Sequence, residues 1–266
     1  MPQILLTGAS GQLGTRLRQW FTARGRSFLA TDIVAPADGA AVELVDLANG
    51  AEVDRLMIQD ISAVVHFGGM ASEAGWQTLL EANIMGTYNI FEAARKAGVT
   101  RIIFASSYHV QGMYPTGGEP VAPEDPYRPD SLYGVSKAFG ETLSRLYFDK
   151  FGIECLAIRI CAASAPSSPR DARLWFSQDD MSSLVDHALD VPVLGHRTMF
   201  GISDNPNAFF RNPPDADFGW SPGHGALELC TPDPREPLDA ADPRQRLIGG
   251  AFTQWGHPAD EASARS

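Results

Sequence analysis

The chain has 266 residues and a formal net charge of −11 at pH 7, and it is long enough to bury a sizeable core in one large domain or in one domain with an appended lobe. The negative charge argues against nucleic acid and anionic membrane surfaces as partners, because both are bound through basic surfaces. Three cysteines without metal-ligand spacing, and no apolar run of membrane-spanning length, predict a soluble protein of a reducing cytoplasm.

The first predicted strand, 3–7, ends in a turn with glycine at every third position and leads into a helix expected over 12–24. Glycine lets the backbone turn tightly and lie against a pyrophosphate, and the following helix offers its N-terminal N–H groups to the phosphate charge. The glycines of this turn are Gly8, Gly11 and Gly14. This order of strand, glycine turn and helix predicts a dinucleotide site.

A second predicted strand, 27–32, ends in Asp32, about 20 residues after the glycine turn. A carboxylate at that distance accepts hydrogen bonds from the adenosine ribose and repels a 2′-phosphate. We therefore expect NAD rather than NADP as the cofactor.

Short apolar runs alternate with amphipathic helical stretches as far as residue 161. The predicted strands lie at 3–7, 27–32, 42–46, 62–67, 100–106 and 154–161, and the main helices at 12–24, 73–97 and 131–151. Such alternation is typical of βαβ units, and it predicts an α/β fold with a doubly wound, mostly parallel Rossmann sheet.

After residue 161 proline becomes dense, and the sequence shows one clear helix, 179–189, and one further candidate strand, 192–200. We expect residues 162–266 to form a small, loop-rich C-terminal cap over the carboxyl ends of the strands, where open α/β sheets bind ligands. This substrate-binding cap would form one compact unit with the NAD-binding region, 1–161.

Tyr133 and Lys137 are four residues apart and fall on one face of the helix expected over 131–151. A phenol with a pKa of about 10 is a poor base, and a neighbouring ammonium favours its charged form. Alone, such a pair also fits a solvated helix face. However, the strand 100–106 leads directly into Ser107, whose hydroxyl can hydrogen-bond a substrate oxygen and help the tyrosine to take its proton.

These segments together resemble the extended short-chain dehydrogenase/reductase superfamily over residues 1–161 at least. The matching segments, in chain order, are TGASGQLG, Asp32, Val45-Asp46-Leu47, His66-Phe67-Gly68-Gly69, Asn83, SSYHVQG and YGVSK. The resemblance implies that Ser107 polarises the reacting oxygen and that Tyr133 is the catalytic acid/base. It also implies that Lys137 binds the nicotinamide ribose and lowers the tyrosine pKa.

The same resemblance assigns a cofactor site and an assembly. Asp46 and Leu47 would lie by the adenine, and Gly68, Gly69 and Asn83 near the nicotinamide half of NAD. The full set of implied NAD-binding residues is Gly8, Gly11, Gln12, Leu13, Gly14, Asp32, Ile33, Asp46, Leu47, Phe67, Gly68, Gly69, Asn83, Tyr133, Lys137 and Ile160. A homo-oligomer is implied as well, paired through the helices that carry Asn83 and the Tyr-Lys motif.

Within the superfamily, the chain is more closely similar to the bacterial uronate dehydrogenases, and this similarity continues through the cap. The matching runs are 146–152, 175–180, 192–195 and 249–252. That family oxidises C1 of a hexuronic acid, such as glucuronate or galacturonate, to the aldonolactone with NAD and needs no metal. His, Asp and Glu do not cluster at metal-ligand spacing in this sequence either.

A sugar-binding set follows from the same similarity. It implies that His109 contacts the sugar and that Arg170 holds its carboxylate, a task that suits the guanidinium fork. The implied substrate-binding residues are Ala71, Ser107, Tyr108, His109, Tyr133 and Arg170. The loop 164–173 is one residue shorter than in the family, which leaves Arg173 as a competing anion ligand.

Several of the family's polar positions differ in this chain. Tyr108 replaces an asparagine, Ala71 replaces a serine, and a further serine is missing from 161–163. Because hydrogen-bonding groups discriminate strongly between sugars, the open alternatives are C1 oxidation of a neutral aldose or of a sugar with another anion at C6, such as the C6-sulfonated sugar sulfoquinovose.

Two further readings are less favoured. A nucleotide-sugar epimerase or dehydratase is disfavoured because the cap is short and Ser107 is followed by Tyr-His rather than by the Asp-Glu pair of the dehydratases. A non-catalytic NAD sensor typically loses the tyrosine or the lysine, whereas this chain keeps both. His66, at the end of the strand 62–67, is expected to be a satisfied core histidine rather than a catalytic one.

Overall fold

The computed structural model describes residues 3–213 and 218–256, and its centre is one seven-stranded sheet in the order β3-β2-β1-β4-β5-β6-β7. Every neighbouring pair of strands in it is parallel. The strands are β1 Gln3–Thr7, β2 Phe28–Asp32, β3 Glu43–Leu44, β4 Ile61–His66, β5 Arg101–Ser107, β6 Glu154–Ile160 and β7 His196–Gly201. This is the predicted doubly wound Rossmann sheet.

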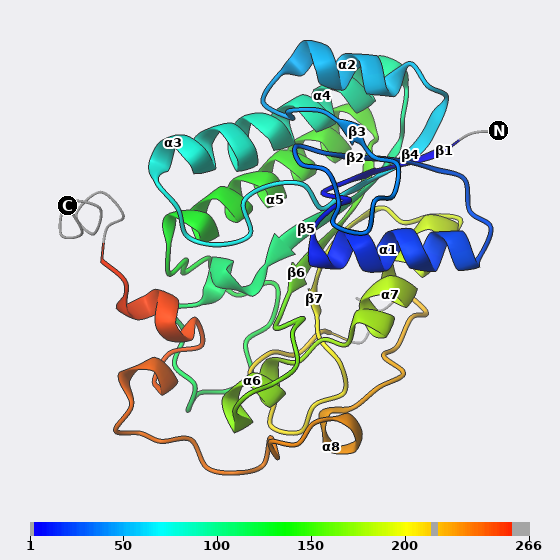
Figure 1. Cartoon of the computed structure of the whole chain (residues 1–266). Helices are drawn as coiled ribbons and strands as arrows, with labels where there is room; N and C mark the ends of the chain where they lie inside the picture. The colour runs from blue at the N-terminus through cyan, green and yellow to red at the C-terminus, as the bar shows by residue number, and fades with distance from the viewer. Residues whose placement is uncertain (1–2, 214–217, 257–266) are drawn as a thin grey trace.

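Helices cover both faces of the sheet, with α2, α4 and α5 on one face and α1 and α7 on the other (Figure 1). The helices are α1 Gln12–Ala23, α2 Gly50–Met57, α3 Trp76–Leu79, α4 Gly86–Ala97, α5 Leu132–Phe151, α6 Pro169–Leu174, α7 Gln178–Asp190 and α8 Ala226–Leu229. A π-helical segment joins α3 to α4, and short 3₁₀ turns occupy Tyr108–Gln111, Pro243–Gln245 and Gly250–Gln254.

The central strands are rich in apolar residues, as expected where both faces of a strand are buried. In β5, Ile102 packs in the core beneath α2, α4 and α5, while its neighbour Ile103 packs in the core beneath α1 and α7. Both side chains are fully buried. Alternate residues of one strand therefore hold the two helical layers together.

Three predicted elements differ from the structure in extent. The run 42–46 pairs with its neighbour only over Glu43–Leu44, and the helix expected over 73–97 starts later, at α3, and is interrupted by the π-helical segment Leu80–Met85. The last strand begins at His196 rather than at residue 192. Proline at the start of that run has no N–H for a ladder, and Gly195 adopts a φ of 64°.

Residues beyond 161 do not all lie in a cap. The strand β7 forms the edge of the sheet beside β6, and α7 packs against α1. Two helices besides α7 occur there, α6 and α8, which are too short for a helical period to reveal them in the sequence. A cap boundary at residue 161 therefore does not coincide with the edge of the sheet.

The remaining C-terminal segments cross the carboxyl ends of the strands. Ile248 donates its N–H to the Tyr114 carbonyl at 2.8 Å, and Gly249 donates to the Gly112 carbonyl at 2.7 Å. A small separate core, which includes Phe200, Phe210 and Ile248, fixes these segments. Within the described ranges, no helix is long and apolar enough to cross a membrane.

Candidate active site

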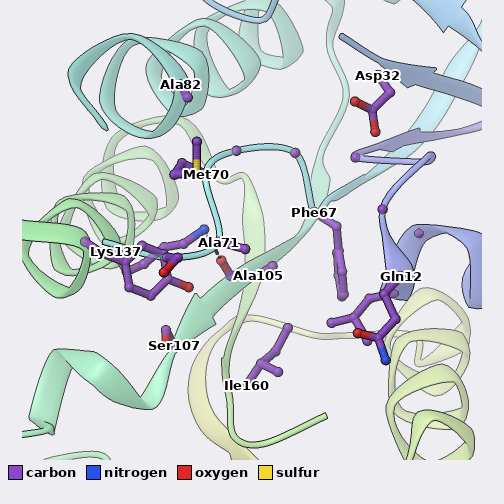
Figure 2. Close-up of a pocket in the computed structure, with 18 of the residues that line it drawn as sticks. Gln12, Asp32, Phe67, Met70, Ala71, Ala82, Ala105, Ser107, Lys137 and Ile160 are labelled. Atoms are coloured by element: carbon purple, nitrogen blue, oxygen red, sulfur yellow. Dashed lines mark hydrogen bonds between the residues drawn. The ribbon is translucent and has the colours of Figure 1, made fainter. Parts of the chain in front are cut away.

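A cavity of about 880 Å³ lies at the carboxyl ends of β1, β2, β4, β5 and β6. All the predicted cofactor- and substrate-binding residues line it except Asn83 and Arg170. Figure 2 shows Asp32 and Gln12 at one end of this cavity and Ser107 and Lys137 at the other. The sequence-predicted adenosine end and acid–base end thus belong to a single continuous space.

The glycine turn after β1 brings the start of α1 to the cavity. Gly8 has a φ of 71°, and a Cβ there would lie 2.5 Å from the Phe67 carbonyl carbon. A Cβ on Gly14 would lie 2.0 Å from the Gly8 oxygen, whereas one on Gly11 would meet nothing closer than 3.5 Å. Packing therefore requires glycine at Gly8 and Gly14. At Gly11, the absence of a side chain would leave the N-terminus of the helix open to a phosphate.

Asp32 fixes the geometry of the adenosine end. Its carboxylate accepts hydrogen bonds from the backbone N–H of Ser10 at 2.8 Å and of Ile33 at 2.7 Å. These bonds tie the glycine turn to the loop that follows β2. The side chain remains partly exposed in the cavity, so its oxygens can also accept from a ribose.

Ser107, Tyr133 and Lys137 meet at the opposite end, and all three are buried. Ser107 is the last residue of β5, and Tyr133 and Lys137 project from the first turns of α5. The helix begins there because the Ser131 hydroxyl accepts from the Gly134 N–H at 3.0 Å and the Glu73 carboxylate accepts from the Tyr133 N–H at 2.7 Å.

The electrostatics of this group are set mainly by burial. Burial raises the pKa of Tyr133 to about 12, a change that the charge of Asp130 increases and a hydrogen bond with Ser107 opposes. Burial also lowers the pKa of the Lys137 ammonium to about 8. In the protein alone, burial thus has the largest effect on the pKa of Tyr133, and the Lys137 ammonium donates its hydrogen bond to the Ala105 carbonyl at 2.9 Å.

Asn83 does not line the cavity but is hydrogen-bonded with Met70, which does. Its side chain is buried, its Oδ1 accepts from the Met70 N–H at 2.7 Å, and its Nδ2 donates to the Met70 carbonyl and to the Ser136 hydroxyl. Asn83 therefore fixes the loop after β4, which lines the cavity, and its predicted place near the nicotinamide half stays a prediction. The π-helical segment that carries Asn83 turns its amide toward that loop.

The two candidate anion ligands are placed differently. Arg170 donates to the Ile248 carbonyl and is hydrogen-bonded with Tyr108, so Tyr108 rather than Arg170 lines the cavity. The buried Arg170 Nε has no hydrogen-bond partner among the described residues. Arg173 is held away by the carbonyls of Pro234 and Glu236, each 2.7 Å from its guanidinium.

Phe252 is a cavity residue that the sequence analysis did not single out. It lies in the 3₁₀ turn Gly250–Gln254, and its ring stacks on His109 with 3.9 Å between the ring centroids. The run 249–252 matched the uronate dehydrogenases, and that match was the one available signal. Nothing in the local pattern indicates that an irregular segment so late in the chain reaches the catalytic helix.

His66 confirms its predicted structural role. It is buried at the end of β4, with Nδ1 2.8 Å from the Thr7 hydroxyl and Nε2 3.2 Å from the Thr87 hydroxyl. The Thr7 hydroxyl also accepts from the Gly68 N–H at 3.0 Å. This histidine therefore supports the turn beneath the centre of the cavity.

Comparison with known proteins agrees with this geometry. Residues 4–195 match the family described as the NAD dependent epimerase/dehydratase family. The chain is 38% identical to the uronate dehydrogenase of Pseudomonas syringae pv. tomato over 265 residues, covering 97% of this chain and 96% of that one. It is 39% identical to the uronate dehydrogenase of Agrobacterium fabrum, with 95% and 97% covered.

The solved structures give the same result. A mutant uronate dehydrogenase from Agrobacterium tumefaciens complexed with NAD superimposes with a TM-score of 0.88 at 38% identity, covering 96% of this chain and 98% of that chain. Glucuronic acid dehydrogenase from Chromohalobacter salexigens has a TM-score of 0.88 at 37% identity, with 97% and 99% covered. With its glycine turn, its Ser-Tyr-Lys group and these relatives, the chain belongs to the NAD dependent epimerase/dehydratase family, alongside the uronate dehydrogenases.

Proposed function

We propose that the protein oxidises C1 of a free hexuronate, such as glucuronate or galacturonate, to the aldonolactone, with NAD as the hydride acceptor. The observation that carries this proposal is one cavity with the Asp32 carboxylate at one end and a buried Ser-Tyr-Lys group at the other. Near-full-length relatives that are uronate dehydrogenases support the substrate class.

The residues present fit NAD. The cavity backbone carries no Cβ at Gly11, α1 directs its N-terminal N–H groups to that point, and Asp32 can accept from the ribose hydroxyls. Asp46 and Leu47 would flank the adenine, and the remaining cavity residues assigned to NAD would follow the cofactor toward Lys137. When bound, NAD supplies the nicotinamide carbon that accepts the hydride from C1.

The acid–base work falls to the protein. In this mechanism the Ser107 hydroxyl hydrogen-bonds the C1 oxygen and the Tyr133 phenolate takes the proton of the C1 hydroxyl. Since burial raises the pKa of this phenol to about 12, it needs a nearby positive charge, and the buried Lys137 ammonium is the group suited to supply it while it holds the nicotinamide ribose.

The sugar end would be formed by residues from both regions of the chain. Ala71, Tyr108 and His109 line it from the Rossmann sheet, and Phe252 lines it from the cap. Arg170 does not line the cavity but is hydrogen-bonded with Tyr108, which does. Its buried Nε has no hydrogen-bond partner among the described residues. These observations support its assignment to the sugar's anionic group, reached directly or through the Tyr108 hydroxyl.

The test is NADH formation by the purified protein with NAD and a panel of free sugars. Glucuronate and galacturonate are expected to react, while glucose and galactose react far more slowly. Tyr133→Phe should lower kcat by roughly 10²–10⁴-fold and leave the Kd of NAD within a few-fold. Release of the aldarate formed when the lactone hydrolyses, at one equivalent per NADH, confirms the reaction. Sugar interconversion without net NADH would replace this proposal with an epimerase.

A second substrate is favoured by one observation. The positions at the sugar end that would carry hydroxyl groups in the family are Ala71 and the segment 161–163 here, and both contribute apolar atoms to the cavity. A C6-sulfonated glucose keeps the anion and the C1 chemistry while changing those contacts. Turnover of that sugar, with none of the uronates, would identify it as the substrate.

We also propose that the protein is a cytoplasmic homo-oligomer. Its three cysteines are free thiols, as a reducing compartment requires. Large apolar side chains are exposed on α4 and α5, namely Tyr88, Val135, Leu146 and Phe151, and exposed apolar side chains on these helices are compatible with a symmetric contact. Light scattering on the purified protein would give a mass that is a multiple of 28.7 kDa, and a monomer mass would reject the assembly.

A further inference from the structure

Asp130 lies just before α5 in a closely fitting pocket outside the cavity. Its side chain is fully buried, its Oδ2 lies 2.7 Å from His109 Nδ1, and its Oδ1 accepts from the Ser131 hydroxyl at 2.7 Å. Backbone from two distant segments surrounds the carboxylate. A Cβ on Gly112 would lie 1.7 Å from Oδ2, and a Cβ on Gly249 would lie 1.9 Å from it. The fold therefore leaves room for this carboxylate by placing glycine on both sides of it.

His109, the hydrogen-bond partner of Asp130, is also held in one orientation. The His109 ring lies between Tyr108 and Phe252, with centroid separations of 4.1 and 3.9 Å, and it meets the Tyr133 ring edge-on with 5.8 Å between the centroids. His109 is buried yet lines the cavity. The stacking prevents the ring from tilting, and the bond at Nδ1 prevents it from turning over.

A carboxylate can only accept hydrogen bonds, so the hydrogen of a neutral imidazole in this position lies on Nδ1. Nε2 then carries a lone pair. We infer that Asp130 is a positioning residue that fixes this tautomer of His109, so that Nε2 accepts a hydrogen bond from a sugar hydroxyl close to the carbon that Tyr133 serves. The identity of the ligand rests on the proposed function, whereas the tautomer does not.

A fixed His109 tautomer would make the site selective between sugars. An acceptor fixed in one orientation favours a sugar with a hydroxyl at that point over an analogue without it, because a buried acceptor left unpaired loses its hydrogen bond and its contact with water. His109 would thus recognise a donor hydroxyl of the sugar other than the C1 hydroxyl, which Ser107 and Tyr133 contact.

The first test uses histidine labelled with ¹⁵N and NMR at pH 8 on the whole protein without added sugar. The His109→Gln variant identifies the His109 resonances by their loss. The expected spectrum has the hydrogen of His109 on Nδ1 and a bare Nε2. A hydrogen on Nε2, or on both nitrogens, overturns the inference. This measurement needs no variant of Asp130 and so does not depend on whether such a variant folds.

Asp130→Asn gives the second readout, because an amide can accept from Nδ1 or donate to it and so removes the preference for one tautomer. The matched control is Asp180→Asn, which changes a buried carboxylate 2.9 Å from His224 Nδ1 and away from the cavity. Asp130→Asn should alter the His109 signals, and Asp180→Asn should alter only those of His224. An unchanged His109 tautomer in Asp130→Asn overturns the positioning role.

Kinetics then test the contact with the sugar. Asp130→Asn should raise KM for the uronate about tenfold, the loss expected for one well-oriented hydrogen bond, with the Kd of NAD unchanged. Because Asp130 acts through His109, the double variant with His109→Gln should match His109→Gln alone. Additive effects overturn the inference. If the wild type oxidises no uronate, the proposed function fails, while the NMR result still decides the tautomer.

Discussion

At the scale of the residue, Asp32 shows how one carboxylate can serve both the fold and the choice of cofactor. Its two oxygens accept backbone N–H groups from the turn after β1 and from the loop after β2. Under the proposed function, the same oxygens would lie where the 2′-phosphate of NADP would have to fit. A residue that holds two loops together would then also set the cofactor preference.

Asp32→Ala should reduce this preference. Without the carboxylate there is no charge to repel a 2′-phosphate, and the ribose hydroxyls lose their acceptor. The ratio of kcat/KM with NAD to kcat/KM with NADP should fall by roughly tenfold or more, measured by the formation of the reduced cofactor. Asp54→Asn, in a surface pair with Lys96, is the control and should leave the ratio unchanged. A constant ratio in Asp32→Ala would remove this residue from cofactor selection.

The same scale explains which site residues could be predicted. Asp32, Ser107 and Tyr133 lie at strand ends or on a helix face, so a local pattern fixes their position. Phe252 could not be predicted, because it reaches His109 only through the long-range bonds of an irregular segment. The partners of Asn83, Met70 and Ser136, could not be predicted either, because they depend on how two helices meet.

At the scale of the element, glycine has two different roles in the turn between β1 and α1. The sequence motif alone does not distinguish them. Gly14 lies so close to the Gly8 carbonyl that a Cβ would be 2.0 Å from the oxygen. Gly11 has room for a Cβ within the protein but stands at the N-cap of α1. One glycine allows the helix to pack on the strand, and the other leaves space for the cofactor.

Paired alanine variants should separate these two uses. Gly14→Ala should lower the free energy of unfolding by about 1–3 kcal/mol, because the backbone must shift to relieve the clash. Gly11→Ala should leave the free energy of unfolding nearly unchanged and weaken NAD binding. Urea unfolding and calorimetric titration with NAD provide the two measurements. Equal loss of stability in both variants would contradict the division.

Elements were predicted best where their pattern was long and regular. The strand β5 and the helix α5 have nearly their predicted bounds because buried apolar faces and clear end signals define them. The helix expected over 73–97 was predicted as continuous, because no proline marks the π-helical segment Leu80–Met85 in the sequence. The start of β7 was misplaced because a proline and a left-handed glycine precede it.

At the scale of the whole molecule, one buried side chain contributes to the loss of stability in acid. Burial, together with the smaller effect of the Lys137 charge, lowers the pKa of His66 to about 3. In the unfolded chain its pKa returns to about 6.5. Between these values the unfolded chain binds a proton that the folded protein does not, so the free energy of unfolding falls as the pH falls below about 6.5.

This dependence can be isolated with His66→Gln. The wild type should lose up to about 1.4 kcal/mol of unfolding free energy per pH unit from this group between about pH 6 and pH 4. The variant should show a slope that is smaller by that amount, whatever its stability at neutral pH. Urea unfolding at several pH values gives both slopes. Equal slopes would mean that His66 does not carry this part of the acid sensitivity.

The closure of the sugar end by Gly249 and Phe252 has a consequence for how the protein is made. Chains fold from the N-terminus as they leave the ribosome. The last residue assigned to NAD is Ile160, whereas the wall of the sugar end is complete only when Phe252 has been added. A growing chain therefore completes its cofactor groove well before it completes its sugar pocket. Premature termination or proteolysis before residue 247 would yield a protein that retains the cofactor groove and has lost its enzymatic activity.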